Sequence, residues 1–235
     1  QQAFRVKFGK EIFEGYGCTE TAPVASVNTE NVLLSDFLTM QVNTKSGTVG
    51  IALPGTQFLI VDPETNEELP VGEAGMILIG GCQVMEGYLK DPERTKNAFV
   101  MVDGNKFYRT GDKGYIDSDG FLTIVDRYSR FAKLGGEMVS LGAVEKFIQD
   151  LEILDGFDYS VTTVADEAKG ERIVLLYQNM DKTPADLLSE LRASGMPPLM
   201  IPSFAFQVEN MPKLGTGKTD YMAAKKMAAE LVAAR

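Results

Sequence analysis

Four short segments of the sequence combine glycine with polar side chains that could contact a ligand. The first, residues 15–20 (Gly-Tyr-Gly-Cys-Thr-Glu), brings together an aromatic ring, a hydroxyl and a carboxylate. Glycine lets the backbone approach a ligand closely, a ring offers a stacking face, and hydroxyl and carboxylate groups can hold a phosphate and its metal ion. A strand-ending turn with a capping box uses the same residue types, so this segment alone leaves both interpretations open.

The second and third segments are short and charged. Residues 108–112 (Tyr-Arg-Thr-Gly-Asp) end on Asp112, whose carboxylate could accept hydrogen bonds from the vicinal hydroxyls of a ribose. A solvated turn residue or a helix cap is the usual alternative. Asp126-Arg127 precedes the sequence Lys-Leu-Gly-Gly-Glu at 133–137. A charged joint followed by a bulged hairpin would also explain this third segment.

The fourth segment, residues 212–219, ends in Gly-Lys-Thr and so matches the end of a phosphate-binding P-loop. The glycine that should open that pattern is replaced by Pro212, and the segment lies late in the chain, so the P-loop interpretation fails. A flexible glycine loop that presents Lys218 remains. Such a lysine could neutralise charge in a transition state, although an exposed loop lysine is the simpler interpretation of this residue alone.

The composition of the 235-residue chain excludes several functions. Its formal net charge is −10 and its pI is about 4.7, which does not suit binding to nucleic acid or to an anionic membrane. The chain has no His, so a His-based catalytic triad or a His-ligated metal site cannot form. Cys18 and Cys82 lie far apart and favour a reducing compartment over a disulfide framework. No apolar run reaches the length of a membrane span. Because the chain opens on Gln1, we expect it to be a piece of a longer protein.

The elements that must position these segments follow from turn residues and hydrophobic periodicity. In the first half we expect strands and one short helix, namely strands at 57–61, 76–79, 106–108, 114–116 and 121–125, a turn at 117–120 and a helix at 91–99. In the second half we expect a hairpin at 131–139, helices at 142–151, 184–194 and 219–234, and strands at 159–165, 171–177 and 203–208. The predicted fold class is α+β, with a β-rich domain over residues 1–127 and a small α+β domain over residues 128–235.

Taken together and in this order, the segments resemble the adenylate-forming (AMP-binding) superfamily, which includes acyl-CoA synthetases, luciferases and nonribosomal-peptide adenylation domains. The matching motifs are Tyr-Gly-x-Thr-Glu, Gly-Tyr at 87–88 with Pro92 and Thr95, Tyr-Arg-Thr-Gly-Asp, Asp-Arg, and Pro-Lys-x-x-x-Gly-Lys. A closer resemblance is to the synthetase part of the bacterial bifunctional 2-acylglycerophosphoethanolamine acyltransferase/acyl-[acyl-carrier-protein] synthetase. The segments that carry it are 14–24, 130–141, 169–171 and 214–221. The resemblance implies the last part of a large adenylation domain followed by a whole, mobile small domain.

The resemblance also implies a two-step ligase. A fatty acid carboxylate attacks the α-phosphorus of Mg-ATP, and the thiol of phosphopantetheine, on an acyl carrier protein or coenzyme A, then takes the acyl group and releases AMP. The residues that would contact nucleotide or Mg²⁺ are Tyr16 (on adenine), Gly17, Thr19 (α-phosphate), Glu20 (Mg²⁺), Asp112 (ribose), Ile124 (near the base) and Arg127 (ribose and phosphate). Lys218 would be the catalytic cation that bridges the acyl carboxylate and the α-phosphate.

In this family the small domain rotates between the two half-reactions. Gly135 and Gly136 would then line the pantetheine path. The hinge position is Ser129, where the wider superfamily often has Asp or Lys, so hinge behaviour stays open. The superfamily's Ser/Thr/Gly-rich phosphate loop does not occur in this sequence, and we expect the chain alone to be inactive.

Two alternatives stay open. One is a long-chain fatty acid:CoA ligase, which differs in the thiol acceptor, and the other is a non-catalytic module that docks carrier proteins. Joint retention of Glu20, Asp112, Arg127 and Lys218 argues against the docking module. For the parent protein the resemblance implies an additional acyltransferase activity and a place on the cytoplasmic side of a bacterial inner membrane, with membrane contact through parts outside this chain.

Overall fold

The computed structural model describes residues 1–36, 38–168, 170–178 and 181–235, and the chain divides into two compact units. The first unit runs from Gln1 to Tyr128 and the second from Ser129 to Arg235. The division falls one residue later than the expected boundary of 127/128. Tyr128 packs against the buried Leu59–Phe107 cluster of the first unit, and this contact explains why it belongs there.

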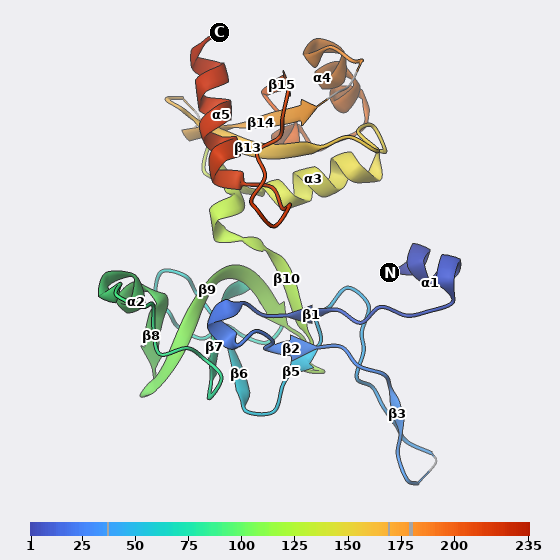
Figure 1. Ribbon diagram of the computed structural model, residues 1–235, viewed down its shortest axis with the longest axis vertical. Coiled ribbons are helices and arrows are strands. Elements are labelled where there is room, and N and C mark those ends of the chain that lie inside the picture. Colours follow the sequence, from blue (N-terminus) through green and yellow to red (C-terminus); the bar gives the residue numbers. More distant parts are fainter. Residues whose placement is uncertain (37, 169, 179–180) are drawn as a thin grey trace. The chain divides into compact units, whose positions relative to one another are not determined.

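The first unit is rich in β-strands, as the sequence predicts (Figure 1). Its helices are α1 (Gln2–Phe8), the 3-10 helix η1 (Thr19–Thr21) and α2 (Pro92–Ala98). Its strands are β1 (Gly15–Tyr16), β2 (Ser26–Val27), β3 (Val32–Leu33), β4 (Met40–Gln41), β5 (Ile51–Ala52), β6 (Thr56–Val61), β7 (Gly75–Gly81), β8 (Phe99–Val102), β9 (Asn105–Ile116) and β10 (Leu122–Arg127).

Three sheets organise these strands. The largest has the antiparallel order β10-β9-β7-β6, with β8 also paired to β9, and the others are β1-β2-β5 and the hairpin β3-β4. Successive side chains along β6 and β7 point to opposite faces of the large sheet. Ile60 and Ile77 therefore lie on one face, and Leu59 and Leu78 lie on the other. The first face also packs Ala25 and the side chain of Tyr16, so one hydrophobic cluster joins the large sheet to the segment that begins at β1.

The sequence-based expectation of separate strands at 106–108 and 114–116 is wrong. A single strand, β9, runs through both, and it pairs with β7, β8 and β10. Gly111 and Asp112 therefore lie inside a strand and not in a turn. The strand stays continuous because Gly111 adopts φ 77° and the pairing shifts locally at Met76–Leu78 and at Ile124–Asp126.

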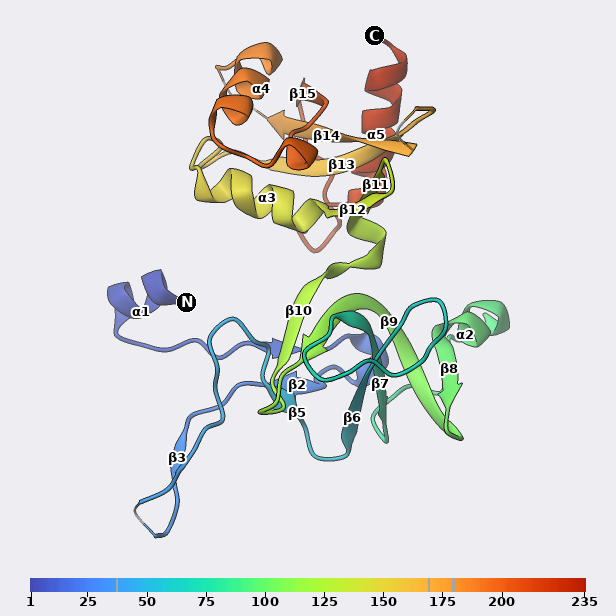
Figure 2. The same ribbon diagram turned by 180° about the vertical axis from the view of Figure 1, so that it is seen from behind.

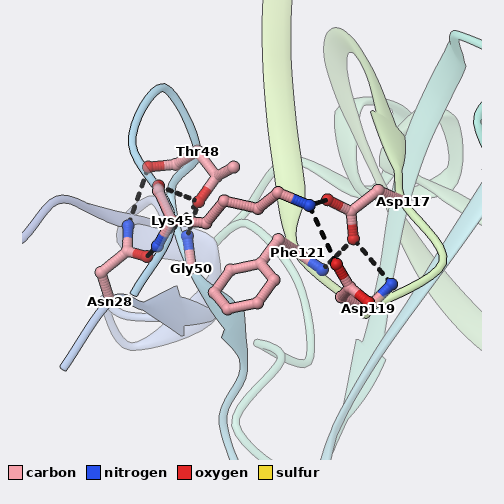
Figure 3. Close-up of polar contacts among 7 residues, drawn as sticks. All are labelled: Asn28, Lys45, Thr48, Gly50, Asp117, Asp119 and Phe121. Carbon is pink, nitrogen blue, oxygen red and sulfur yellow. Dashed lines mark hydrogen bonds and ion pairs between the residues drawn. The ribbon is translucent and has the colours of Figure 1, made fainter. Parts of the chain in front are cut away.

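A polar cluster fixes β2 and β5 to the β9–β10 turn (Figure 3). Buried Asn28 donates from Nδ2 to the Thr48 carbonyl at 2.8 Å, and its Oδ1 accepts from the Lys45 amide at 3.1 Å. The Lys45 ammonium reaches Asp117 at 2.6 Å and Asp119 at 3.0 Å. These contacts hold the small sheet, whose outer strand β1 carries Tyr16.

The second unit contains the 3-10 helices η2 (Tyr128–Arg130, which spans the division) and η3 (Pro198–Met200), and the helices α3 (Leu141–Asp150), α4 (Pro184–Ala193) and α5 (Tyr221–Ala233). Its strands are β11 (Phe131–Leu134), β12 (Glu137–Ser140), β13 (Tyr159–Asp166), β14 (Gly170–Gln178) and β15 (Phe204–Val208). The sheet order is β12-β11-β14-β13, and β15 pairs in parallel with β14.

Strand β14 contributes to hydrophobic clusters on both faces of this sheet. Ile173, Leu175 and Tyr177 point into the cluster formed with α3 and α4, whereas Val174 and Leu176 point into the cluster formed with α5. Figure 1 shows α5 on one face, and Figure 2 shows α3 and α4 on the other. The α+β class expected for this region is confirmed.

Two findings complete the fold. Among the described residues, none of the helices combines the length and the apolar character that crossing a bilayer requires. Lys169, the first residue of the 169–171 segment singled out in the sequence, lies outside the described residues.

Candidate functional site

Asp112 is the centre of the polar site in the first unit. Its side chain is buried, and each carboxylate oxygen receives a donor from a different element. The hydroxyl of Tyr16 on β1 donates to Oδ2 at 2.5 Å, and the guanidinium Nε of Arg127 at the end of β10 donates to Oδ1 at 2.8 Å. The fold thus brings together three of the side chains that the sequence singles out, although they are up to 111 positions apart in the numbering.

Local backbone contacts fix Asp112 in the strand. Its amide donates to the hydroxyl oxygen of Thr110 at 3.0 Å, and that hydroxyl donates to the Ile77 carbonyl on β7 at 2.8 Å. Thr110 was not among the residues predicted from the sequence. Because the bulged backbone leaves ladder positions unpaired here, the threonine hydroxyl takes over the role of a backbone group.

The electrostatics of this trio follow from burial beside a carboxylate. Burial, followed by the negative charge of Asp112, raises the pKa of Tyr16 well above its ordinary value. The same charge raises the pKa of Arg127. Tyr16 is therefore a neutral hydrogen-bond donor and Arg127 a cation, with most of the Arg127 side chain exposed to solvent (65%) and able to reach an anion.

Glu20 forms a second polar centre in the same unit. The hydroxyl of Tyr88 donates to Glu20 Oε1 at 2.7 Å, and the Glu20 carbonyl accepts from the Met85 amide at 2.9 Å. Burial acts to raise the pKa of Glu20, but the hydrogen bond from Tyr88 and the charge of Arg94, among others, outweigh it and lower the pKa. Glu20 is thus held as a carboxylate.

Tyr88 is positioned by helix α2, which explains the Gly-Tyr…Pro…Thr pattern. The Asp91 carboxylate caps α2 by accepting from the Arg94 amide, and Pro92 occupies the first helical turn. Thr95 Oγ1 accepts from the Tyr88 amide at 2.8 Å and donates to the Asp91 carbonyl. Tyr88 was part of a motif in the sequence, but its contact with Glu20 was not predicted.

The turn at residues 15–20 also forms a capping box, which is the structural alternative that the sequence leaves open. Cys18 caps η1, and Thr21 Oγ1 accepts from the Cys18 amide at 3.1 Å, so the cap is made by Cys18 and Thr21. Thr19 and Glu20 take no part in that capping box, and Thr19 is exposed. A Cβ at Gly17 would lie 1.9 Å from the Pro23 carbonyl oxygen. The turn itself therefore requires glycine at this position, whatever ligand it contacts.

Ile124 lies on β10 beside the bulge at 124–126. Its side chain is partly buried and packs against the same hydrophobic cluster as Tyr16. An apolar side chain and an aromatic ring on the same hydrophobic cluster offer the kind of surface that a nucleobase can contact.

Lys218 lies in the second unit, in the glycine loop expected from the sequence, and hydrogen bonds within this loop form a turn. The Leu214 amide donates to the Lys218 carbonyl at 2.8 Å, and the Gly217 amide donates to the Leu214 carbonyl at 2.8 Å. Lys213 pairs with Thr219 in an isolated bridge, and the Lys213 ammonium contacts Asp158 at 2.6 Å. This small hydrogen-bonded turn presents the exposed Lys218.

The glycine hairpin also lies in the second unit. Gly135 and Gly136 connect β11 to β12 with φ 60° and 95°, values that favour glycine. A Cβ at either position would meet no atom within 4 Å, so within this unit the glycines serve the turn and leave its surface open. Ser129 is exposed in η2 at the start of the unit.

The residues present suit a nucleotide with its magnesium ion. A buried carboxylate flanked by neutral and cationic donors can bind sugar hydroxyls, and a glycine turn with Thr19 offers small polar groups to a phosphate. Within the described residues no cluster of three or more His, Cys, Asp or Glu forms a protein-only metal site. Mg²⁺ commonly uses one or two carboxylates together with substrate phosphates, and Glu20 suits that arrangement.

A family model described as "AMP-binding enzyme" matches residues 1–89. The chain is 36% identical over 172 residues to 4-coumarate–CoA ligase 1 of Petroselinum crispum, covering 73% of this chain and 30% of that protein. It is 30% identical over 222 residues to 4-coumarate–CoA ligase 1 of Glycine max, covering 93% of this chain and 72% of that protein.

Solved structures give the same result for the fold. ATP-bound MatB from Rhodopseudomonas palustris superposes with a TM-score of 0.77 at 27% identity, over 98% of this chain and 43% of that one. The fold and the sequence similarity together are those of a part of an adenylate-forming (AMP-binding) enzyme. The chain belongs to the AMP-binding enzymes, and it spans about a third of the length of the Petroselinum relative.

Proposed function

We propose that this chain is part of a ligase that activates a fatty acid as an acyl-adenylate and transfers the acyl group to the phosphopantetheine thiol of an acyl carrier protein. The observation that carries the adenylation step is the Tyr16–Asp112–Arg127 arrangement, in which a buried carboxylate is held between a neutral hydroxyl and an exposed guanidinium. Tyr16 and Ile124 provide the apolar surface for the base, and Asp112 binds the ribose.

The chemistry needs cations more than it needs a protein nucleophile. The fatty acid carboxylate attacks the α-phosphorus of ATP, a P–O bond forms, and pyrophosphate leaves. Because two anions must meet, Lys218 and Arg127 lower the barrier by neutralising their charge. In the second step the thiol sulfur attacks the acyl carbonyl, loses its proton to solvent, and AMP leaves. Mg²⁺ bound through Glu20 would supply further charge neutralisation on the phosphates.

The carrier protein as acceptor is supported by the sequence resemblance of residues 130–141 and 214–221 to the acyl-carrier-protein synthetase branch. Coenzyme A is the second candidate, because relatives with 30–36% identity are named CoA ligases. We further propose that the acyl group serves reacylation of 2-acylglycerophosphoethanolamine at the cytoplasmic side of a bacterial inner membrane, through an acyltransferase activity in another part of the protein.

The test uses the full-length protein that contains this chain, as wild type and as Lys218→Ala. Each is given ATP, Mg²⁺ and either a long-chain fatty acid or 4-coumarate, with holo-acyl carrier protein or coenzyme A as acceptor. Acylation of the carrier protein by the fatty acid, lost in Lys218→Ala, is the expected result. Acylation of coenzyme A alone would overturn the choice of acceptor. Absence of pyrophosphate release with either acid would overturn adenylation and favour a docking module.

A further inference from the structure

One carboxylate in the second unit links three elements of the fold. Glu171 lies at the beginning of β14, and 22% of its side chain is exposed. Its Oε2 accepts from the backbone amide of Lys133 on β11 at 2.8 Å. Its Oε1 accepts from the hydroxyl of Thr163 on β13 at 2.8 Å and lies 3.3 Å from the ammonium of Lys225 on α5. The proposed roles of Tyr16, Asp112, Arg127 and Lys218 do not involve this residue.

The carboxylate replaces a missing step of the β-ladder. Among the described residues, the register between β11 and β14 consists of the pair Leu134–Gly170. Continued in the same register, Lys133 would lie opposite Glu171, and here the side chain of Glu171 accepts the hydrogen bond of the Lys133 amide. The two backbones are close, because a Cβ at Gly170 would lie 3.1 Å from the Lys133 carbonyl oxygen. A hydrogen bond to an ionised acceptor is stronger than a neutral one.

This bond acts on the glycine hairpin. The base of the hairpin is anchored by the buried side chains of Ala132 and Val139, whereas the turn at Gly135 and Gly136 is open. The Lys133 amide lies between the anchored base and the open turn. The hydrogen bond to Glu171 therefore holds β11 at the point where the strand leaves its buried base and approaches the open turn.

We propose that Glu171 is a positioning residue for the thiol-transfer step, which holds the Gly135–Gly136 turn in the orientation that admits the pantetheine arm. The inference rests on the proposed function for the role of that turn. Among the described residues of this unit, Glu171 contacts the hairpin directly through Lys133 and makes no hydrogen bond or ion pair with Lys218. Its loss therefore affects the second half-reaction far more than the first.

The test separates the two half-reactions in the full-length protein. Acid-dependent ATP–pyrophosphate exchange measures adenylation, and acyl transfer from preformed acyl-adenylate at varied thiol concentration measures the second step. For Glu171→Ala we expect exchange within about threefold of wild type, and kcat/KM for the thiol reduced by about tenfold, as loss of one charge-assisted hydrogen bond predicts. Glu171→Gln keeps one oxygen acceptor for the Lys133 amide and should recover part of the loss.

Two controls isolate the hairpin. Lys225→Ala removes the ion pair of Glu171 but leaves its bond to Lys133, so thiol transfer should remain near the wild-type rate. Glu230→Ala removes an exposed carboxylate on α5 and should have no effect on either step. Hydrogen exchange of the peptide 131–140 gives a readout independent of activity: in Glu171→Ala its amides should exchange faster, while those of α3 stay unchanged.

The outcomes are distinguishable. If wild type shows no exchange with any acid, the proposed function fails before Glu171 is tested. If wild type is active and Glu171→Ala lowers both half-reactions equally, or neither, the positioning role is overturned. If Glu171→Ala accelerates exchange throughout α3 and β13, the variant has lost its fold and the comparison passes to Glu171→Gln. In that case, unchanged kcat/KM for the thiol and unchanged 131–140 exchange in Glu171→Gln overturn the proposal.

Discussion

Each carboxylate oxygen of Asp112 accepts a hydrogen bond from another side chain, and these two bonds fix the orientation of the carboxylate. Tyr16 and Arg127 orient the carboxylate and leave its remaining lone pairs for sugar hydroxyls. In Asp112→Asn, an amide NH2 group replaces one carboxylate oxygen and faces the donor of Tyr16 or of Arg127. We expect nucleotide affinity to fall by about tenfold or more. Calorimetric titration of AMP measures it, with exposed Asp119→Asn as the matched control, and equal affinities in the two variants would contradict the assignment.

Tyr88 orients the proposed magnesium ligand Glu20. In Tyr88→Phe the ring stays beneath the Arg94 guanidinium, which lies 3.8 Å from its centroid, but the hydroxyl donor is lost. Removing the group that orients a metal ligand commonly lowers metal affinity by about tenfold or more. We expect the Mn²⁺ affinity of the nucleotide complex, measured by electron paramagnetic resonance, to fall by about tenfold, while AMP affinity without metal is unchanged. A loss of AMP affinity instead would assign Tyr88 to the nucleotide pocket.

Glu171 also predicts a pH dependence. Burial acts to raise its pKa, but hydrogen bonds from Lys133 and Thr163 and the contact with Lys225 outweigh burial and lower the pKa below the ordinary value of 4.5. The folded state thus binds this proton less tightly than the unfolded state. Its stabilising effect is complete above about pH 4.5 and is lost as the pH falls through the lowered pKa. In urea unfolding, the stability difference between wild type and Glu171→Gln should therefore shrink on acidification, and a constant difference would contradict this.

The sequence predicted residue identities at the site better than it predicted their partners. Residue types and order marked Tyr16, Glu20, Asp112 and Arg127, because those side chains carry recognisable chemistry. Tyr88 and Thr110 lie in the named motifs, but their hydrogen bonds with Glu20 and Asp112 were not predicted. The contact between positions 20 and 88 depends on how α2 packs and leaves no local signal in the sequence. Glu171 belongs to the segment 169–171 that carries part of the resemblance, but the sequence assigns it no role. Its proposed role follows from where the ladder between β11 and β14 stops.

At the scale of elements, the polar cluster around Asn28 supports the strand that carries Tyr16. Asn28→Ala would leave the buried Thr48 carbonyl and the Lys45 amide without their side-chain partner. We expect a loss of about 2 kcal/mol in the free energy of unfolding. Lys45→Ala removes exposed ion pairs with Asp117 and Asp119 (Figure 3), and we expect a much smaller effect because such pairs are screened by solvent. Urea denaturation of both variants compares them, and equal losses would contradict this ranking.

Element types followed from periodicity, and the errors arose where tertiary packing overrides it. Helix α2 (Pro92–Ala98, N-cap Asp91) lies within the helix predicted at 91–99. The 12-residue strand β9 was predicted as two strands, since glycines at 111 and 114 look like a break in the sequence. Gly114 lies within the ladder, where the strands pair so closely that a Cβ at this position would be 2.4 Å from the Thr123 carbonyl oxygen. The pairing therefore requires glycine here. In α5, Ala224 and Ala228 face the core, whereas Met222 is 81% exposed.

At the scale of the whole molecule, each unit has its own hydrophobic core. The two clusters that flank the second sheet consist entirely of residues between Ala132 and Val232. We therefore expect residues 129–235, expressed alone, to fold and to unfold cooperatively in urea. Near-ultraviolet circular dichroism, which reports on the buried Tyr177, measures the transition. A gradual change of the signal with urea concentration, without a folded baseline, would show that the second unit needs the first unit in order to fold.

The two-sided burial of β14 has a consequence for the order of folding. Neither helical layer can close before this strand is in place, because Leu175 belongs to one core and Leu176 to the other. Its antiparallel partner β13 is close in sequence, whereas parallel β15 arrives only after the α4 crossover. Contacts between near neighbours form at a lower entropic cost, so the β13–β14 hairpin is the natural nucleus. Substitutions at Leu175 and Leu176 should slow refolding alike, although their side chains lie on opposite faces of the sheet.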